Sequence, residues 1–205
     1  MLIASMELDL ENEYADRAYA LLSNLVMPRP IAWVTTIDGK GVVNAAPFSF
    51  FNVLGANPPI VGFCPGDRPD GTPKDTALNI RETHEFVVNL VDGPLAEAMC
   101  LTAASLPHGV SELAGTKLTT TASSLVKPPR ITESPASLEC MEWGTLQIGD
   151  NRLIIGLVKR LHLRDELFDP ETRHIRGETF HPIGRMGSPN WYCQSTARFE
   201  MKRPD

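Results

Sequence analysis

The chain has 205 residues, of which 42% are hydrophobic and 21% are charged, and its net charge is -6. This composition excludes a disordered chain, because enough apolar side chains are present to build a core. The acidic balance argues against a nucleic-acid partner, which needs a basic face, and no apolar run is long enough to cross a bilayer. We therefore expect a single domain over residues 1–205, with no nucleic-acid and no membrane partner.

The amino terminus, MLIASMELDLENEYADRA, is acidic where an export signal is basic. From this we expect a cytoplasmic protein. The pattern over residues 13–22 predicts the first helix.

A β-hairpin is predicted over residues 31–50. Two apolar, β-branched runs flank Asp-Gly-Lys-Gly at 38–41, which is a turn sequence. The returning half contains small residues that let a flat ligand approach the backbone, and Pro47 lacks an amide donor, so we expect strand pairing to break there. The segment fits the edge of a planar cofactor, but also an ordinary edge hairpin with a bulge.

A phosphate cradle is predicted at the start of the next helix. Residues 59–64 form a buried strand in this interpretation, and the turn-rich PGDRPDGTP follows it. In the helix after it we expect Asp75 as N-cap, with Lys74 and Thr76 beside the unpaired N–H groups of the first turn. A capped surface helix without a ligand is the alternative.

The remainder of the chain predicts mostly strands. The expected elements are a strand at 86–91, a helix at 95–104, an irregular excursion at 105–135 with one short strand or helix, and an antiparallel pair at 138–148 and 152–163 across the turn 149–151. Many short strands separated by turns are typical of a closed or nearly closed antiparallel barrel.

Cysteines and histidines show no catalytic or metal-binding pattern. Four cysteines at 64, 100, 140 and 193 lack C-x-x-C spacing, so we expect free, mostly buried thiols and no metal. His84 and His174 lie in polar surroundings and are expected to face solvent, and His181 precedes PIGRMG near the carboxyl end.

An ordered set of motifs resembles the flavin reductase-like family of FMN-binding split-barrel proteins, and most closely its branch with flavoredoxin and the reductase component of nitrilotriacetate monooxygenase. The motifs are RPIAWVTT at 29–36, NAAPFSFFN at 44–52, PP at 58–59, KDTALNI at 74–80, EFVVNLV at 85–91, KPPRITESP at 127–135, GDNRLIIGLV at 149–158 and HPIGRMG at 181–187. The set covers nearly the whole chain in one order. Any one motif is weak, and the ordered set is specific.

The resemblance implies a mainly β fold, namely a six-stranded antiparallel Greek-key split barrel with short peripheral helices. It implies a homodimer with FMN at the subunit interface. A barrel of this size is filled by side chains, so the cofactor would lie outside it and need a second wall. NADH or NADPH would be a transient co-substrate, because no G-x-G-x-x-G follows a predicted strand.

The resemblance also assigns residues to the cofactor. The backbone of Asn44, Ala45, Ala46, Pro47 and Phe48 would follow the isoalloxazine edge. Ser49, Phe50 and Phe51 would reach the ribityl chain and phosphate, with at most one of the two rings touching the cofactor. Thr35 and Thr36 would donate hydroxyls, Arg29, Lys74, Asp75 and Thr76 would form the phosphate site, and Arg185 would approach from the carboxyl end.

Each of these assignments has a structural alternative. Trp33 fits the core better than a flavin stack, and Arg29 would also suit a salt bridge with a local carboxylate. No catalytic side chain is expected, because hydride transfer between two cofactors needs positioning and no protein acid or base.

One departure from the family concerns mechanism. Many flavin reductases of the superfamily have Gly-Asp-His where this chain has Gly149-Asp150-Asn151, and that histidine is associated with the nicotinamide side of the site. Two functions stay open: an NAD(P)H:flavin reductase that supplies reduced FMN to a monooxygenase, and an FMN-bound electron carrier that serves a partner protein.

Overall fold

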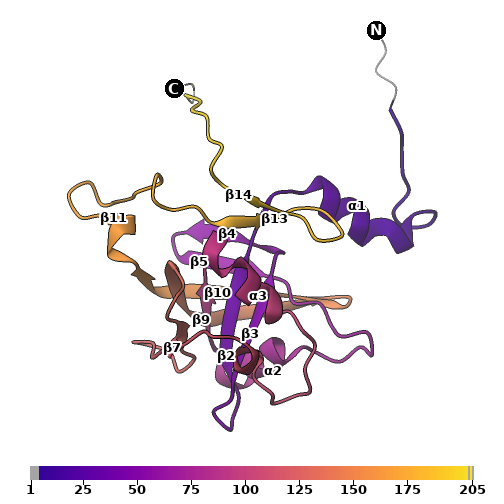
Figure 1. Ribbon diagram of the computed structural model, residues 1–205. Coiled ribbons are helices and arrows are strands. Elements are labelled where there is room, and N and C mark those ends of the chain that lie inside the picture. Colours follow the sequence, from indigo (N-terminus) through magenta and orange to yellow (C-terminus); the bar gives the residue numbers. More distant parts are fainter. Residues whose placement is uncertain (1–4, 203, 205) are drawn as a thin grey trace.

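The computed structural model describes residues 5–202 and 204, and its principal element is a curled antiparallel sheet (Figure 1). The strand order is β3-β2-β6-β9-β10-β5-β4. These strands are β2 (Ala32–Ile37), β3 (Val43–Phe48), β4 (Phe51–Ala56), β5 (Pro59–Phe63), β6 (Glu85–Asn89), β9 (Ala136–Ile148) and β10 (Asn151–Leu163). The mainly β split-barrel prediction is confirmed, with seven strands in this sheet instead of six.

Smaller elements surround the sheet. The helices are α1 (Ala18–Leu25), α2 (Asp75–Thr83) and α3 (Ala96–Leu101), with 3-10 turns η1 (Ala15–Arg17), η2 (Gly93–Leu95), η3 (Glu112–Gly115) and η4 (Asp165–Leu167). The short strands are β1 (Arg29–Pro30), β7 (Thr120–Thr121), β8 (Arg130–Ile131), β11 (Phe168–Asp169), β12 (His174–Ile175), β13 (Ile183–Arg185) and β14 (Tyr192–Gln194). No helix within the described residues has the length and apolar character needed to cross a membrane.

Three aromatic rings show that the sheet closes on itself. Phe48 lies on the first strand in the sheet order and Phe63 on the sixth, yet their ring centroids are 5.2 Å apart. Phe63 in turn packs edge-on against Phe86 of β6 at 5.5 Å. Gly156 of β10 faces the same interior, where a Cβ atom would collide with the Phe86 ring. The barrel is therefore filled by side chains, as a barrel of this size must be.

A second apolar cluster covers the outer face of β2. It contains Trp33, Met99 of α3, Ile131 of β8 and Ile183 of β13. The Trp33 indole is fully buried and donates to Thr102 Oγ1 at 2.9 Å, which confirms its place in the core. Because both faces of β2 are covered, its side chains lie inside the protein.

Several predicted boundaries differ from the structure. The first helix begins later than residue 13, because the Asp9 carboxylate accepts the N–H groups of Glu11 and Asn12 and forms a turn there. Pairing does not break at Pro47: the ladder with β2 continues to Phe48, and β3 is an edge strand where proline is tolerated. The predicted long hairpin is confirmed as β9 and β10.

Candidate functional site

A polar cavity of about 190 Å³ lies between β3 and the start of α2. Its wall combines residues from three parts of the chain: Asn44, Ala46, Pro47 and Phe48 of β3, then Arg68, Lys74, Asp75 and Thr76, and finally Thr102 to Leu106 with Glu112. Seven of the fifteen predicted cofactor residues thus line this cavity.

The start of α2 supplies unpaired amides to this cavity. Lys74 is the N-cap in an extended conformation, and its carbonyl accepts the N–H groups of Ala77 and Leu78. Asp75 is the first helical residue, so the prediction of Asp75 as N-cap is wrong by one position. The first N–H groups of a helix have no partner within it, so the amides of Asp75 and Thr76 are suited to an anion.

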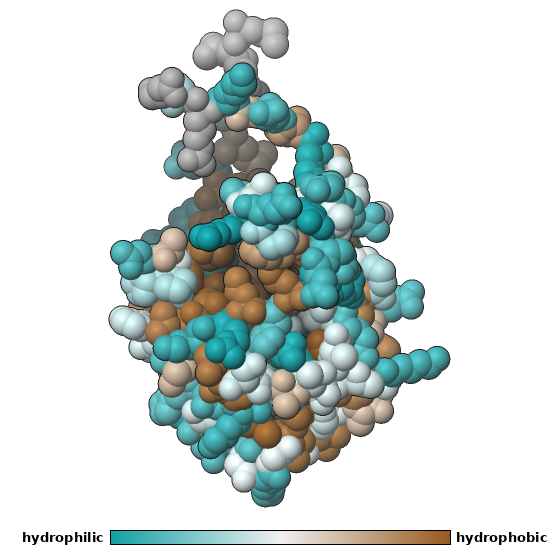
Figure 2. All heavy atoms as spheres, turned by 90° about the vertical axis from the view of Figure 1, so that its left-hand side faces the viewer, coloured by the Kyte–Doolittle hydropathy of each residue, from teal (hydrophilic) through white to brown (hydrophobic). Residues whose placement is uncertain are grey.

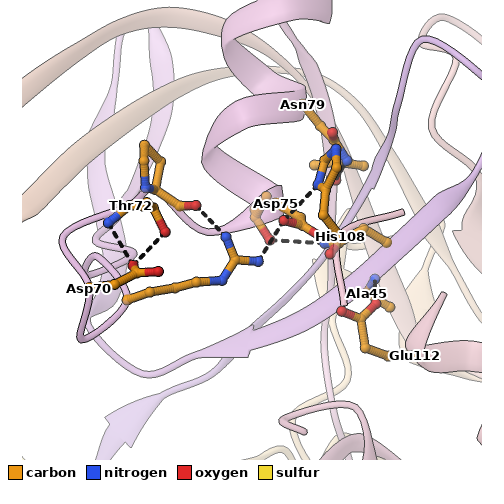
Figure 3. A network of polar contacts seen from close by, with 12 residues as sticks. Ala45, Asp70, Thr72, Asp75, Asn79, His108 and Glu112 are labelled. Carbon is orange, nitrogen blue, oxygen red and sulfur yellow. Dashed lines mark hydrogen bonds and ion pairs between the residues drawn. The ribbon is translucent and has the colours of Figure 1, made fainter. Parts of the chain in front are cut away.

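The Asp75 carboxylate is held by two basic side chains and is not free to cap the helix. Arg68 Nη2 donates to Asp75 Oδ1 at 2.6 Å, and His108 Nδ1 lies 3.0 Å from the same oxygen (Figure 3). Burial opposes ionisation of Asp75, but the hydrogen bonds from Arg68 and His108 outweigh it and lower its pKa. Arg68 and His108 therefore hold Asp75, the first residue of α2, in place.

Lys74 carries the positive charge that this network leaves unneutralised. Its ammonium lies 5.6 Å from the centroid of the Phe48 ring and forms no ion pair within the part of the chain that the structure describes. Partial burial, followed by the nearby Arg68 guanidinium, lowers the pKa of Lys74. Beside it, Asn44 Nδ2 donates to the buried Thr76 hydroxyl at 2.9 Å.

Glu112 is the acidic group of the cavity and was not predicted. Its Oε2 accepts the backbone N–H of Ala45 at 3.0 Å, and Figure 3 shows the two residues together away from Asp75. Burial raises the pKa of this carboxyl. Ala45 is fully buried and its amide is occupied, so its predicted contact with a ring edge is not available in this structure.

Thr35 and Thr36 do not reach the cavity. Both are fully buried, Thr35 Oγ1 donates to the Pro129 carbonyl at 2.6 Å, and Asn79 Nδ2 donates to Thr36 Oγ1 at 3.0 Å. Their predicted role as flavin donors conflicts with this geometry, because β2 is a central strand covered on both faces.

Arg29 and Arg185 lie elsewhere, opposite each other in the β1–β13 pair. The buried Arg29 guanidinium donates to the carbonyls of Ser23, Val26 (2.7 Å) and Met186 (3.1 Å), and its Nε lies 3.4 Å from Ser49 Oγ. Arg185 donates to the Pro189 and Trp191 carbonyls. Arg29 and Arg185 are not among the residues that line the polar cavity. Within this single chain the structure therefore does not bring together Arg29 and Lys74, the two cations predicted to share the phosphate.

A second, apolar cavity of about 680 Å³ lies under the carboxyl-terminal segment. Figure 2 shows apolar residues gathered in a hollow beneath a largely hydrophilic overhang. Among the predicted residues it contains Arg29 and Phe51. Phe50 instead lies outside, with its ring 5.9 Å from the Tyr19 ring, so the two phenylalanines do point in different directions.

The other singled-out residues lie away from the polar cavity. Asn151 begins β10, bridges to Gly66 and donates to the Asp150 carboxylate at 2.7 Å. The cysteines are free, but only Cys140 is fully buried and Cys100 is exposed, so the expectation of mostly buried thiols is wrong. No cluster of three or more potential metal ligands occurs among residues 5–202 and 204.

Sequence reasoning found the β3 and α2 sides of the cavity but missed its third side. Arg68 lies in the turn-rich segment that precedes Lys74, and this closeness in the sequence is the one signal that could have indicated a place for Arg68 in the cavity. Ala45 and Glu112 are 67 positions apart, and nothing in the sequence indicates that they meet.

Comparisons with known proteins identify the family of the chain. Residues 23–182 match the family described as flavin reductase like domain. An uncharacterized protein of Deinococcus radiodurans is 43% identical over 190 residues, which are 90% of this chain and 84% of that protein.

Two solved structures share both fold and sequence. Nitrilotriacetate monooxygenase component B from Bacillus cereus has a TM-score of 0.90 and 32% identity, covering 98% of this chain and 100% of that chain. The Pseudomonas fluorescens 2-nitrobenzoate 2-nitroreductase NbaA has a TM-score of 0.88 and 34% identity, covering 97% and 96%. With the family match over most of its length and relatives this similar, the chain belongs to the flavin reductase-like family.

Proposed function

We propose that the protein is an FMN-binding oxidoreductase of the NAD(P)H:flavin reductase type that supplies reduced flavin to a monooxygenase. This proposal rests on the Lys74 ammonium beside the first amides of α2, which have no partner in the described part of the chain, in a cavity of a flavin reductase-like protein. The similar Bacillus cereus protein is by its name a monooxygenase component, which supports the choice of partner.

The polar cavity fits the phosphate end of FMN. An ammonium, helix amides and the Thr76 hydroxyl are donors that a phosphate dianion needs, and hydrogen bonds to charged groups are the stronger kind. The Asn44–Thr76 bond holds the hydroxyl in place. We assign Lys74, Thr76 and Asn44 to the phosphate, and the β3 residues Ala46 to Phe48 to the adjoining part of the cofactor.

The rest of the cofactor needs a second wall. Pockets for ligands of this size usually enclose about 300–1,000 Å³, whereas the polar cavity encloses about 190 Å³. Large apolar side chains are also exposed elsewhere on the chain, including Leu25 at 77% and Val53 at 67%, the latter on the wall of the apolar cavity. Exposed apolar surface of this kind marks interaction sites, and we propose a homodimer that covers it and completes the flavin site.

Held by Lys74, Thr76 and Asn44, FMN would supply the hydride-accepting chemistry at its N5 atom, with NADH or NADPH as the donor. The chain's own contribution is to hold and orient the flavin and to exclude water, because positioning provides most of the acceleration in such a transfer. No side-chain acid or base is required for it.

The alternative is an FMN-bound electron carrier without substantial NAD(P)H turnover. Asn151 favours it, because many reductases of the superfamily have histidine at this turn. The carrier would exchange electrons with a partner protein through a flavin that stays bound.

A titration with FMN tests the proposal. Quenching of flavin fluorescence at micromolar protein is the expected result, and light scattering with and without FMN should give the mass of a dimer. Purified protein that neither carries nor binds FMN would contradict the proposed function, and a stable monomer that binds FMN tightly would contradict the shared site.

A further inference from the structure

Glu112 is a half-buried carboxylate on the wall of the polar cavity, and the proposed reaction gives it no role. It begins η3, at the end of the segment 105–111 that follows α3, and η3 packs on β3. Its hydrogen bond to the Ala45 amide places the carboxylate along the open edge of β3. The side chain therefore faces whatever ligand the cavity accepts.

The charge of Glu112 is not neutralised by a cation. No ion pair includes Glu112 among the described residues, and the basic group that acts on it, Arg68, is already bound to Asp75 at 2.6 Å. Burial removes part of the water around the carboxylate and raises the pKa of Glu112. Lys74, on the same wall, likewise has no ion-pair partner within residues 5–202 and 204.

The cavity thus presents one unpaired cation and one unpaired anion, whereas the Arg68–Asp75 pair with His108 is internally satisfied. A ligand with a phosphate dianion is attracted by Lys74 and the α2 amides and is repelled by Glu112. A neutral ligand of the same shape feels neither effect strongly. At the short separations within a small cavity, such interactions change affinity by several-fold to more than tenfold.

We propose that Glu112 is a specificity-determining residue that weakens the binding of the phosphate-bearing flavin and so keeps FMN exchangeable. This inference rests on the proposed function, because it takes FMN as the ligand of the polar cavity. A flavin that leaves readily is a substrate that can be delivered to a second protein. A carboxylate in the cavity that takes the phosphate suits a reductase that must release its flavin, and it works against a carrier that must retain its cofactor.

The test compares FMN with riboflavin, which lacks the phosphate, in wild-type protein and in Glu112→Gln at pH 8. Glutamine keeps a carbonyl oxygen for the Ala45 amide and removes only the charge. Glu97→Gln on α3 is the matched control, because it removes an exposed carboxylate outside the cavity wall. Dissociation constants come from fluorescence quenching, and dissociation rates from stopped-flow dilution.

We expect Glu112→Gln to bind FMN about tenfold more tightly and release it correspondingly more slowly, with riboflavin affinity within twofold of wild type and Glu97→Gln unchanged. The FMN gain should shrink as salt is added, because screening weakens charge interactions. If Glu112→Gln folds poorly, Glu112→Ala is the second variant, and it should also gain affinity for FMN and not for riboflavin.

Two results would overturn the inference: unchanged FMN affinity in both Glu112 variants, or equal tightening of FMN and riboflavin, which would show a change of shape and not of charge. A wild-type protein that binds neither flavin would instead refute the proposed function itself. The two failures are therefore distinguishable.

Discussion

The two cavities lie on either side of the bend at Ser49 and Phe50, and their walls differ in kind. The polar cavity follows β3 and has Lys74, Glu112 and the start of α2 around it. The apolar cavity begins at Phe51 on β4, is several times larger, and is covered by the carboxyl-terminal segment. The same run of sequence thus supplies a site for a charged group on one side and a surface for apolar contact on the other.

Arginine and lysine near a predicted cofactor are not interchangeable, as Arg29 and Lys74 show. Arg29 is buried, and its guanidinium is saturated by backbone carbonyls at the end of α1. Lys74 is exposed and forms no ion pair with any residue that the structure describes. A guanidinium whose donors are engaged by backbone carbonyls has fewer donors left for a ligand than a free ammonium has, which is why we propose Lys74 and not Arg29 as the phosphate partner.

Removing the phosphate donors of the polar cavity should have the largest effect. Lys74→Ala with Thr76→Ala is expected to weaken FMN binding by about 2–4 kcal/mol, because hydrogen bonds to charged groups contribute about 1.5–3 kcal/mol each. Arg198→Ala is the control, since it removes a cation from the apolar cavity. Fluorescence titration measures both, and an unaltered FMN affinity in the double variant would remove the phosphate assignment.

Asp75→Asn should show how far the polar cavity depends on its internal pair. We expect a loss of about 1.5–3 kcal/mol in the free energy of unfolding at pH 7, because Asp75 binds Arg68 and His108. The pKa of Asp75 is lowered in the folded protein, so this stabilisation is complete above the unfolded pKa and is lost as the pH falls through the folded one.

Urea unfolding of wild type and Asp75→Asn at pH 7 and at successively lower pH measures this loss. The difference between the two proteins should narrow only below about pH 4, near the usual pKa of aspartate. A difference that stays constant down to the lowest pH at which both fold would show that the carboxylate charge does not stabilise the site.

How much of this could be predicted from the sequence depends on the range of the contacts. The turn at Gly149-Asp150-Asn151 and the helix after Lys74 depend on residues close in the chain. The sequence predicts both elements, with the N-cap of the helix misplaced by one position. The burial of Thr35 could not be predicted, because Pro129 binds it from 94 positions away. The Arg29–Arg185 pairing has the same origin, since β1 and β13 lie near opposite ends of the chain.

A charge in the apolar cavity should affect self-association instead of phosphate binding. Val53→Asp places a carboxylate on the most exposed of its apolar residues on β4. If this face is the dimer interface, the dimer dissociation constant should rise at least tenfold, about 1.4 kcal/mol. Light scattering over a dilution series measures it, with Ile175→Asp on the exposed β12 as control; equal effects of both variants would contradict the assignment.

The smallest effect is expected at the turn between β9 and β10. Asn151→His should raise the rate of nicotinamide use a few-fold if this position faces the electron donor, because ring positioning carries most of the catalysis and one side chain adds to it. Stopped-flow reduction of bound FMN by NADH compares the two proteins. An identical rate in Asn151→His would place the nicotinamide elsewhere.

The reductase reaction itself is the most direct test of the account. Wild-type protein with FMN is mixed anaerobically with NADH or NADPH, and the flavin absorbance is followed, first with one equivalent of FMN and then with excess free FMN. We expect bleaching of the bound flavin and many turnovers with the excess. Reduction by a chemical reductant but by neither nucleotide would contradict it and would establish the electron carrier as the better description.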